Sequence, residues 1–195
     1  KEEGLLEFYE SLLSAPDSYL SDGLVIDGDT EALPQAIIDA MVAVLQPEIG
    51  EVVTDPTGGS WRLLGQVDRY IKCHTDDHFS LSAEQEQFQR QQALSSVERT
   101  PQSRRFAIMN ALLHDNEGRV DLGDILSSWG GGLSKSDVIV SACLDDARQS
   151  QEPYERADFA HSTYCERLAS LQHIYGNLNP GGRAGVVVRD ELLTD

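Results

Sequence analysis

A strand followed by a glycine turn is the part of this sequence best suited to chemistry. Residues 51–54 carry adjacent valines, which are typical of a strand, and Asp55-Pro56-Thr57-Gly58-Gly59-Ser60 supplies turn-forming residues after it. A doubly wound sheet binds a nucleoside cofactor at such a position. Glycine is needed there because the backbone must approach the ligand and adopt positive φ, which costs a residue with a Cβ roughly 1 kcal/mol or more. The segment therefore predicts a cofactor site.

Two other groups of residues could do chemistry but are less well arranged. Five possible metal ligands lie in one short stretch: Cys73, His74, Asp76, Asp77 and His78. One cysteine with two histidines lacks the paired spacing of a structural zinc site, so we interpret the stretch as a polar surface loop and predict no metal. Cys143 could act as a nucleophile only if the fold brings His161 or His173 beside it.

Alternating helix and strand signals surround the glycine turn. Strands are expected at 51–54, 93–97, 118–126, 137–141 and 184–188. Helices are expected at 5–13, from Pro34, at 63–72, at 84–91, from Pro101 and at 166–178. Residues 137–141 form a continuous apolar run of the kind that is buried on both faces of a parallel sheet. The alternation predicts an open α/β fold, with helices on both faces of a mostly parallel sheet.

Three of these helices carry apolar residues at helical spacing, which predicts the face that each one buries. The predicted faces are Ile37, Ile38, Met41, Val44 and Leu45; then Phe106, Met109 and Leu113; and finally Leu168, Leu171, Ile174, Tyr175 and Leu178.

Composition limits the class of protein. The chain has 195 residues, 40% of them apolar and 25% charged, which suits a globular domain. It contains no apolar run long enough to span a membrane, and its acidic, amphipathic start is unlike a signal peptide. Three scattered cysteines do not make a disulfide framework. These features together predict a cytoplasmic protein.

The formal net charge is −18, spread along the whole chain. Direct binding to a phosphate backbone should therefore be weak unless a partner supplies positive charge. Arg99, Arg104 and Arg105 are the nearest approach to a basic cluster, which we interpret as the solvated start of a helix rather than a nucleic-acid contact. Mimicry of nucleic acid is a second explanation of the acidity, although solubility is the commoner one.

The order of the motifs resembles the methylase subunit of type I restriction-modification systems, a family of N6-adenine DNA methyltransferases. The resemblance covers most of residues 34–190 and is strongest in RRFAIMNALLHDNEGRVDLGDIL (104–126) and LQHIYGNLNPGGRAGVVV (171–188). It implies a Rossmann-like, S-adenosylmethionine-dependent methyltransferase fold over residues 34–195, preceded by a helix and loop at 1–33. The chain stops at Asp195, soon after the fifth expected strand, which allows for a sheet truncated there.

The resemblance also assigns residues to S-adenosylmethionine. In the family, a turn of the pattern Asp-Pro-Ala/Thr-Cys-Gly-Ser/Thr-Gly-Gly-Phe-Leu holds the methionine end of the cofactor, and Asp55, Thr57 and Gly59 match it. Glu98 matches the acid that binds the ribose hydroxyls. Asp124, followed by Ile125, matches the residue that meets the adenine amino group. Cofactor binding by these positions is expected to be weak or vestigial.

That expectation comes from the end of the turn, where Trp61 and Arg62 replace the two later glycines of the family pattern. Such bulky side chains must occupy some space, and the nearest is the ligand's. We therefore expect both to fill the space of the methionine part of the cofactor, and expect their joint replacement by glycine to open it. A second cofactor turn of the family, Gly-Gln-Tyr-Phe-Thr-Pro, has lost both aromatic residues here, where Gly28 to Pro34 stands.

The catalytic turn differs most from the family. Members carry Asn-Pro-Pro-Phe/Tyr after the fourth strand, where the amide and a carbonyl accept hydrogen bonds from the target amino group and the aromatic ring stacks on the flipped base. The corresponding residues are Ala142, Cys143, Leu144 and Asp145. Ala142 has no side-chain acceptor and Asp145 cannot stack.

These losses predict a pseudoenzyme: a methyltransferase-fold domain without activity, which works by contacting a partner. The family implies a specificity subunit or a second methylase-like subunit as that partner, with DNA touched weakly or through it. The alternative is an adenine methyltransferase that is still active, with Asp145 or Asp146 in place of the lost amide.

Overall fold

The structure, a computed structural model, describes residues 33–75, 81–143, 149–190 and 192. The helix expected at 5–13 and most of the turn after Gly28 lie outside these residues. The described part belongs to one compact unit, which extends from Leu33.

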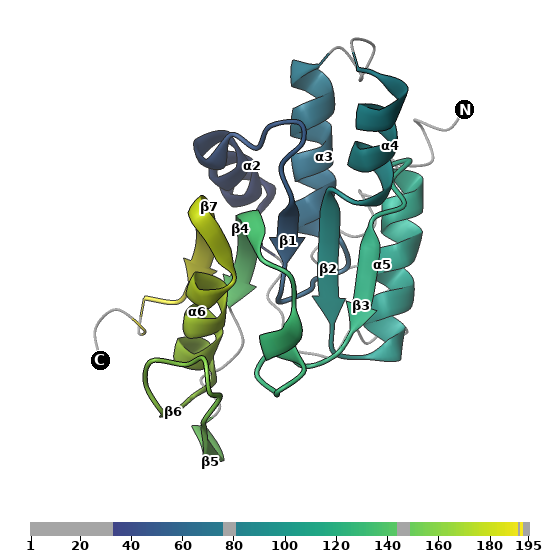
Figure 1. The fold of residues 1–195 in the computed structure, drawn as a ribbon. Coiled ribbons are helices and arrows are strands. Elements are labelled where there is room, and N and C mark those ends of the chain that lie inside the picture. The colour runs from purple at the N-terminus through teal and green to yellow at the C-terminus, as the bar shows by residue number, and fades with distance from the viewer. Residues whose placement is uncertain (1–32, 76–80, 144–148, 191, 193–195) are drawn as a thin grey trace. The chain divides into compact units, whose positions relative to one another are not determined.

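Five parallel strands form the central sheet, in the spatial order β3-β2-β1-β4-β7 (Figure 1). Their bounds are β1 Val53–Asp55, β2 Leu94–Glu98, β3 Arg119–Leu122, β4 Ser136–Cys143 and β7 Leu178–Val188. Each of the five predicted strands is therefore present, and the expected parallel α/β fold is confirmed. The strand that contains Val138 lies inside the sheet, one place from its edge.

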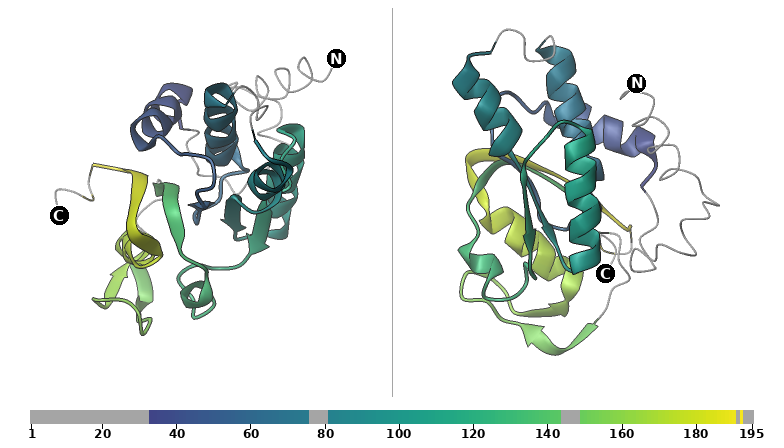
Figure 2. Two further views of the ribbon diagram at one scale, coloured as in Figure 1. Left: turned by 45° about the horizontal axis from the view of Figure 1, so that its top comes forward. Right: turned by 90° about the vertical axis from the view of Figure 1, so that its right-hand side faces the viewer.

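Helices cover both faces of the sheet. They are α2 Gln35–Leu45, α3 Arg62–His74, α4 Ala83–Gln91, α5 Pro101–Leu113 and α6 Glu166–Gly176, with a 3-10 turn η1 at Gly130–Gly132. Figure 2 shows α2, α3 and α5 on one side of the sheet, with α6 on the other. None of the described helices is long and apolar enough to cross a bilayer.

An antiparallel hairpin stands between β4 and α6 and was not predicted. It consists of β5 Gln149–Tyr154 and β6 Thr163–Cys165. Its sequence is mostly polar and alternates too weakly to signal a strand, and only pairing and tertiary contacts give it one.

Alternate residues of β4 divide the apolar core into two layers. Val138 and Val140 face the main cluster, which is built from α2, α3, α5 and the strands. Ile139 and Cys143 face the other way and pack with Ile174 of α6. Both faces of β4 are covered, which explains why the consecutive residues 138–140 are all apolar.

The predicted helix faces were wrong in part. Val44 is 82% exposed and Tyr175 83% exposed, and Met109 and Leu168 also lie at the surface. The buried faces are Ile38, Val42 and Leu45 in α2; Ala107, Asn110 and Ala111 in α5; and Arg167, Ala169, Ser170, His173 and Ile174 in α6. A helix packs closely on a sheet through small residues, and polar side chains are buried where they have partners. Apolar spacing therefore identified Ile38, Leu45 and Ile174 correctly but missed the small and polar residues of these faces.

Candidate functional site

The turn between β1 and α3 has the backbone shape that its glycines suggest. Gly58 and Gly59 have φ of +71° and +119°, and Ser60 and Trp61 follow with φ of 59° and 68°. A Cβ on Gly58 would lie 2.7 Å from Oε2 of Glu98, so glycine is required there by contact as well as by φ. Gly59 has no neighbouring atom within 4 Å of such a Cβ. Four successive residues with positive φ produce the tight reversal from strand into helix.

The Asp55 carboxylate lies beneath this turn, at the end of β1, and is buried. Its Oδ1 accepts hydrogen bonds from the Thr57 amide at 3.0 Å and from the Thr57 hydroxyl at 2.9 Å. Burial, together with the charge of Glu98, raises the pKa of Asp55 to about 8 despite these bonds. Among the described residues, no group donates to Oδ2.

Glu98, at the end of β2, is the second buried acid of the site. Burial raises its pKa, and this effect outweighs that of the Ser103 side chain and of the Ser60 and Gly59 backbones, which lower it. Its Oε1 has no donor within the described part of the chain. Two buried acids therefore lie beside the glycine turn, each with one oxygen that has no donor among the described residues.

The Thr57 hydroxyl connects this turn to the end of β4. Its Oγ1 lies 3.0 Å from Oγ of Ser141 and accepts from the backbone N–H of Ala142 at 3.3 Å. Since the same hydroxyl donates to Asp55, the cofactor turn and the position of the family's catalytic residues share one hydrogen-bonded link.

A cavity of about 440 Å³ lies at the carboxyl ends of β2 and β3, within the size range of small-ligand pockets. It is lined by Arg99, Leu122, Gly123, Asp124, Leu126, Tyr154 and Glu166. Asp124 is held by its own turn, because its Oδ1 accepts from the Leu126 amide at 2.9 Å. The Ile125 side chain instead packs in an apolar cluster with Val97 and Ala169. Leu122 and Leu126, rather than Ile125, supply the apolar part of the cavity lining.

Three of the polar residues that line the cavity were not predicted as site residues. Arg99 directly follows Glu98 and forms an ion pair with Glu166 at the start of α6, across the cavity. Tyr154 comes from the unpredicted hairpin, and burial raises its pKa. The position of Arg99 next to Glu98 was a usable signal, but nothing in the sequence placed Tyr154 there.

The predicted cofactor residues thus fall into two neighbouring groups. Asp55, Thr57, Gly59 and Glu98 form the buried turn, while Asp124 lies at the cavity on the adjacent strand end. The two groups meet through the backbone, because the Gly123 amide donates to the Glu98 carbonyl at 3.0 Å.

The expectation that Trp61 fills the ligand space was wrong. Its side chain is 1% exposed and belongs to the main apolar cluster. The ring extends to Gly118, where an added Cβ would lie 2.7 Å from Cη2 of Trp61. The positive φ turns this side chain into the core, as the peptide beside it is held to α5 by a bond from Asn110 to the Ser60 carbonyl. Arg62, the first residue of α3, is half-buried.

At the position of the catalytic amide, Ala142 and Cys143 are the last two residues of β4 and pair with Val187 and Val188. Ala142 packs against the main apolar cluster, and the buried Cys143 lies 3.6 Å from the Ser141 hydroxyl. Leu144 and Asp145 lie outside the described residues.

The structure also gives the contacts of the possible metal ligands, of the basic cluster and of the possible base for Cys143. His74 stacks on Tyr70, and no group of three ligand-type side chains occurs in the ranges that the structure describes, which omit residues 76–80. Of the basic cluster, Arg99 pairs with Glu166, while Arg104 donates to the Val120 carbonyl at 2.8 Å. His173, one proposed partner of Cys143, is bonded to Arg156 and Asn177.

Comparison with known proteins supplies a family. Residues 31–195 match the family described as N-6 DNA Methylase. The chain is 36% identical over 173 residues to the type I restriction enzyme EcoKI methylase subunit of Escherichia coli K12, a match that covers 82% of this chain and 31% of that protein. The StySJI methylase subunit of Salmonella typhimurium is also 36% identical over 173 residues, with the same coverage of each chain.

Solved structures of type I restriction enzyme subunits are also similar to this chain. The crystal structure of the EcoKI M protein matches with a TM-score of 0.78 and 31% identity, over 96% of this chain and 45% of that one. A modification subunit of a putative type I restriction enzyme from Vibrio vulnificus shares the fold, with a TM-score of 0.74 and 21% identity, over 99% of this chain and 41% of that one. The chain thus spans about a third of the length of the curated relatives that it matches.

Proposed function

Since the chain belongs to the N-6 DNA methylase family, we propose that it is a methyltransferase-fold domain that retains a cofactor site, lacks methyl transfer and acts in the cytoplasm by protein interaction. The family match begins at residue 31, so we assign this role to residues 34–195 and treat 1–33 as a separate N-terminal segment. The observation that carries the proposal is Ala142 at the end of β4.

Methyl transfer to an adenine amino group needs an acceptor for its protons at that strand end. The Ala142 side chain is a methyl group packed on the apolar core. The nearby Ser141 and Thr57 hydroxyls are bonded to each other, and Thr57 also donates to Asp55. Loss of one catalytic hydrogen-bonding group typically lowers a rate about 10² to 10³-fold, so the domain should be inactive.

The two buried acids fit an S-adenosylmethionine site better than the weak or vestigial binding that the sequence predicted. Asp55 Oδ2 and Glu98 Oε1 are buried oxygens without donors among the described residues, and such groups call for a ligand or water. By resemblance to the family, Asp55 would hold the methionine end, Glu98 the ribose hydroxyls and Asp124 the adenine amino group. The cofactor, when bound, supplies an activated methyl group. Because the Trp61 ring lies in the core, it does not stand in the way.

An interaction role is supported by apolar side chains on the outer surface of α6 and its approach. Tyr164, Leu168 and Tyr175 are all large, apolar and more than two-fifths exposed. Leu168 and Tyr175 are seven residues apart in α6, which places them on one side of the helix, and Tyr164 lies in β6 just before it. We propose that this stripe contacts a specificity subunit or a second methylase subunit, and that DNA is reached through that partner because the chain carries a net charge of −18.

Lysine at both Leu168 and Tyr175 is expected to weaken binding to the partner at least about tenfold, since two exposed apolar contacts are lost. The test is sedimentation of the chain with the specificity subunit of the same type I system. Val44→Lys, which changes an equally exposed apolar residue on α2, is the control. An equal effect of the control, or none from the double variant, would exclude this stripe.

The purified chain is expected to transfer no methyl group to duplex DNA, alone or with a specificity subunit. The measurement is transfer of tritium from labelled S-adenosylmethionine to adenine-containing DNA, with calorimetry of cofactor binding on the same sample. Binding without transfer supports a retained cofactor site in an inactive domain, whereas absence of binding removes the cofactor part of the proposal.

The active adenine methyltransferase is the second candidate function, favoured by the 36% identity to methylase subunits and by the retention of Asp55, Glu98 and Asp124. Asp145 or Asp146 would then accept from the amino group. Incorporation of label that disappears in Asp145→Ala would establish this enzyme and reject the inactive domain.

A further inference from the structure

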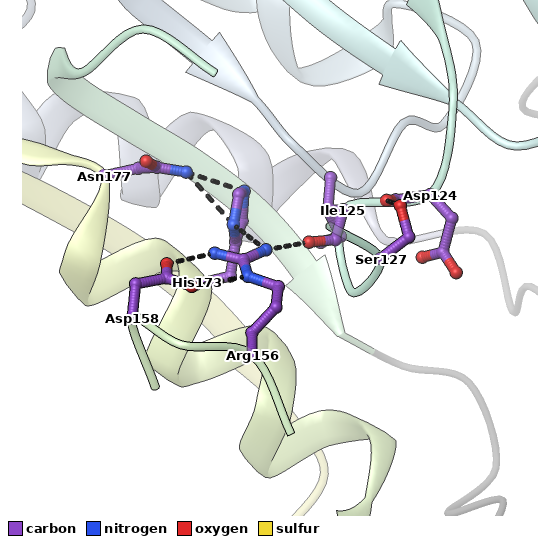
Figure 3. A network of polar contacts seen from close by, with 7 residues as sticks. All are labelled: Asp124, Ile125, Ser127, Arg156, Asp158, His173 and Asn177. Carbon is purple, nitrogen blue, oxygen red and sulfur yellow. Dashed lines mark hydrogen bonds and ion pairs between the residues drawn. The ribbon is translucent and has the colours of Figure 1, made fainter. Parts of the chain in front are cut away.

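Arg156 connects three segments that are far apart in the sequence. It follows strand β5, and its side chain is only 6% exposed. Figure 3 shows its guanidinium between the turn after β3 and helix α6. Nη1 donates to the Ile125 carbonyl and lies 3.1 Å from Nδ1 of His173. A buried arginine with donors directed at one backbone carbonyl fixes the position of that carbonyl.

The surroundings of Arg156 hold its own side chain in place. Nε donates to Oδ1 of Asp158 at 2.8 Å, and Nη2 pairs with the other oxygen of the same carboxylate. The guanidinium carbon also lies 4.4 Å from the centre of the Phe159 ring. Burial, with the Arg156 charge, lowers the pKa of His173 to about 4, so its imidazole is neutral and can accept at Nδ1. The Asn177 amide nitrogen also lies beside the ring, 3.0 Å from Nδ1 and 2.9 Å from Nε2.

The Ile125 carbonyl, which accepts the hydrogen bond from Arg156, lies between two residues that line the cavity. Asp124 and Leu126 line the cavity on either side of Ile125. The turn is otherwise closed by its own short bonds, such as that from the Ser127 hydroxyl to the Asp124 carbonyl at 2.7 Å. A displacement of the Ile125 carbonyl would therefore move the carboxylate and the apolar wall together.

We propose that Arg156 is a positioning residue, which holds the turn from Asp124 to Leu126 in the place where Asp124 selects the amino group of an adenine ring. This inference rests on the proposed cofactor binding for its ligand, but the hold on the turn is a separate, measurable property. Asp124 recognises the amino group as an acceptor, so a purine that lacks this group should bind less well.

Two tryptophans in the chain provide a readout of the turn. Trp129 is 42% exposed, and its ring packs on Gly123, where an added Cβ would lie 2.5 Å from Cζ3. Trp61 is buried in the core and is shielded from a solvent quencher. Acrylamide quenching of fluorescence therefore reports on Trp129 beside the turn, without any ligand.

The test compares Arg156→Gln and Arg156→Lys with Arg104→Gln. Arg104 makes a matched control because it also donates to a carbonyl of this region, that of Val120, but from α5 on the other face of the sheet. Each protein is examined by denaturant unfolding, by acrylamide quenching, and by calorimetry with S-adenosylhomocysteine and its inosine analogue. Binding is measured only under conditions in which the denaturant-unfolding curve shows that the variant is folded.

Both Arg156 variants are expected to raise the quenching constant of Trp129. They should also reduce the preference for the adenosine over the inosine compound from about tenfold toward unity, since that preference depends on one hydrogen bond to a charged group. Lysine should not rescue either property, because one ammonium cannot reach the carboxylate, the carbonyl and the imidazole together. Arg104→Gln should leave both unchanged.

The outcomes separate the two proposals. Unchanged quenching and unchanged preference in a folded Arg156 variant would overturn the role of Arg156. If Arg156→Gln does not fold, the milder Arg156→Lys decides by the same criteria. A further outcome is that the unaltered chain binds neither compound while the Arg156 variants still change the quenching of Trp129. That result would reject the proposed cofactor site and support the role of Arg156 in positioning the turn.

Discussion

Asp55→Asn is expected to raise the free energy of unfolding at pH 8 by about 3 kcal/mol or more, and to change it little near pH 4. The carboxyl has a pKa of about 8 in the folded protein and an ordinary value of 3.8 when unfolded. Its contribution is therefore complete below pH 3.8 and is lost progressively as the pH rises through 8. Asparagine keeps the acceptor for Thr57 and cannot ionise.

Denaturant unfolding of both proteins at several pH values measures this difference. The comparison is needed because His173, with its pKa lowered from 6.5 to about 4, gives the opposite slope between those values and cancels much of the effect in the unaltered protein. The control is Asp137→Asn. Bonds from the Val52 amide and Asn179 lower the pKa of Asp137, so this substitution should destabilise the fold at neutral pH.

If Asp55→Asn fails to stabilise the protein at pH 8, the acid is not held neutral by burial. The same variant is expected to bind S-adenosylmethionine more weakly, provided that the proposed cofactor site is correct, because Asp55 can release its proton and pair with the ammonium of the ligand, whereas an amide cannot ionise. Stability and affinity would then change in opposite directions at one residue.

Trp61→Gly is expected to lower the free energy of unfolding by about 3 kcal/mol. Removal of a large buried ring costs roughly 3 to 5 kcal/mol, and glycine at a positive φ returns about 1 kcal/mol. The ring lies entirely within the main apolar cluster, so no other side chain can readily fill the space. Thermal and urea unfolding give the measurement.

Trp129→Gly is the matched control, since Trp129 is half-exposed and its loss should cost much less. Calorimetry of Trp61→Gly with S-adenosylmethionine should show no gain in affinity. A stable variant that binds the cofactor more tightly would mean that the ring occupies ligand space after all.

The fold was predictable because each strand of the central sheet and most helices carry a local signal. Thr100 and Pro101, for example, do start α5, where the Thr100 hydroxyl accepts from the Ser103 amide at 3.1 Å. The glycine turn was predictable for the same reason, as Gly58 and Gly59 adopt the positive φ that glycine favours.

What the sequence could not give is the direction of side chains and the effect of distant contacts. Trp61 has the unusual φ inferred for its position, but only the fold shows that this φ sends the ring into the core. His173 stood out as a possible base, and its burial beside Arg156 makes it a neutral acceptor instead. The hairpin that carries Tyr154 depends on pairing with a strand eight residues away, which leaves little local pattern.

The hydrogen bonds of the Thr57 hydroxyl suggest how the sequence of such a domain can change during evolution. At the end of β4 this hydroxyl contacts the side chain of residue 141 and only the backbone N–H of residue 142. The contact that holds this strand end to the cofactor turn is thus the same for any residue at 142 that has an N–H. This hydrogen bond therefore does not constrain the side chain of residue 142, whereas selection for methyl transfer would require a hydrogen-bond acceptor there.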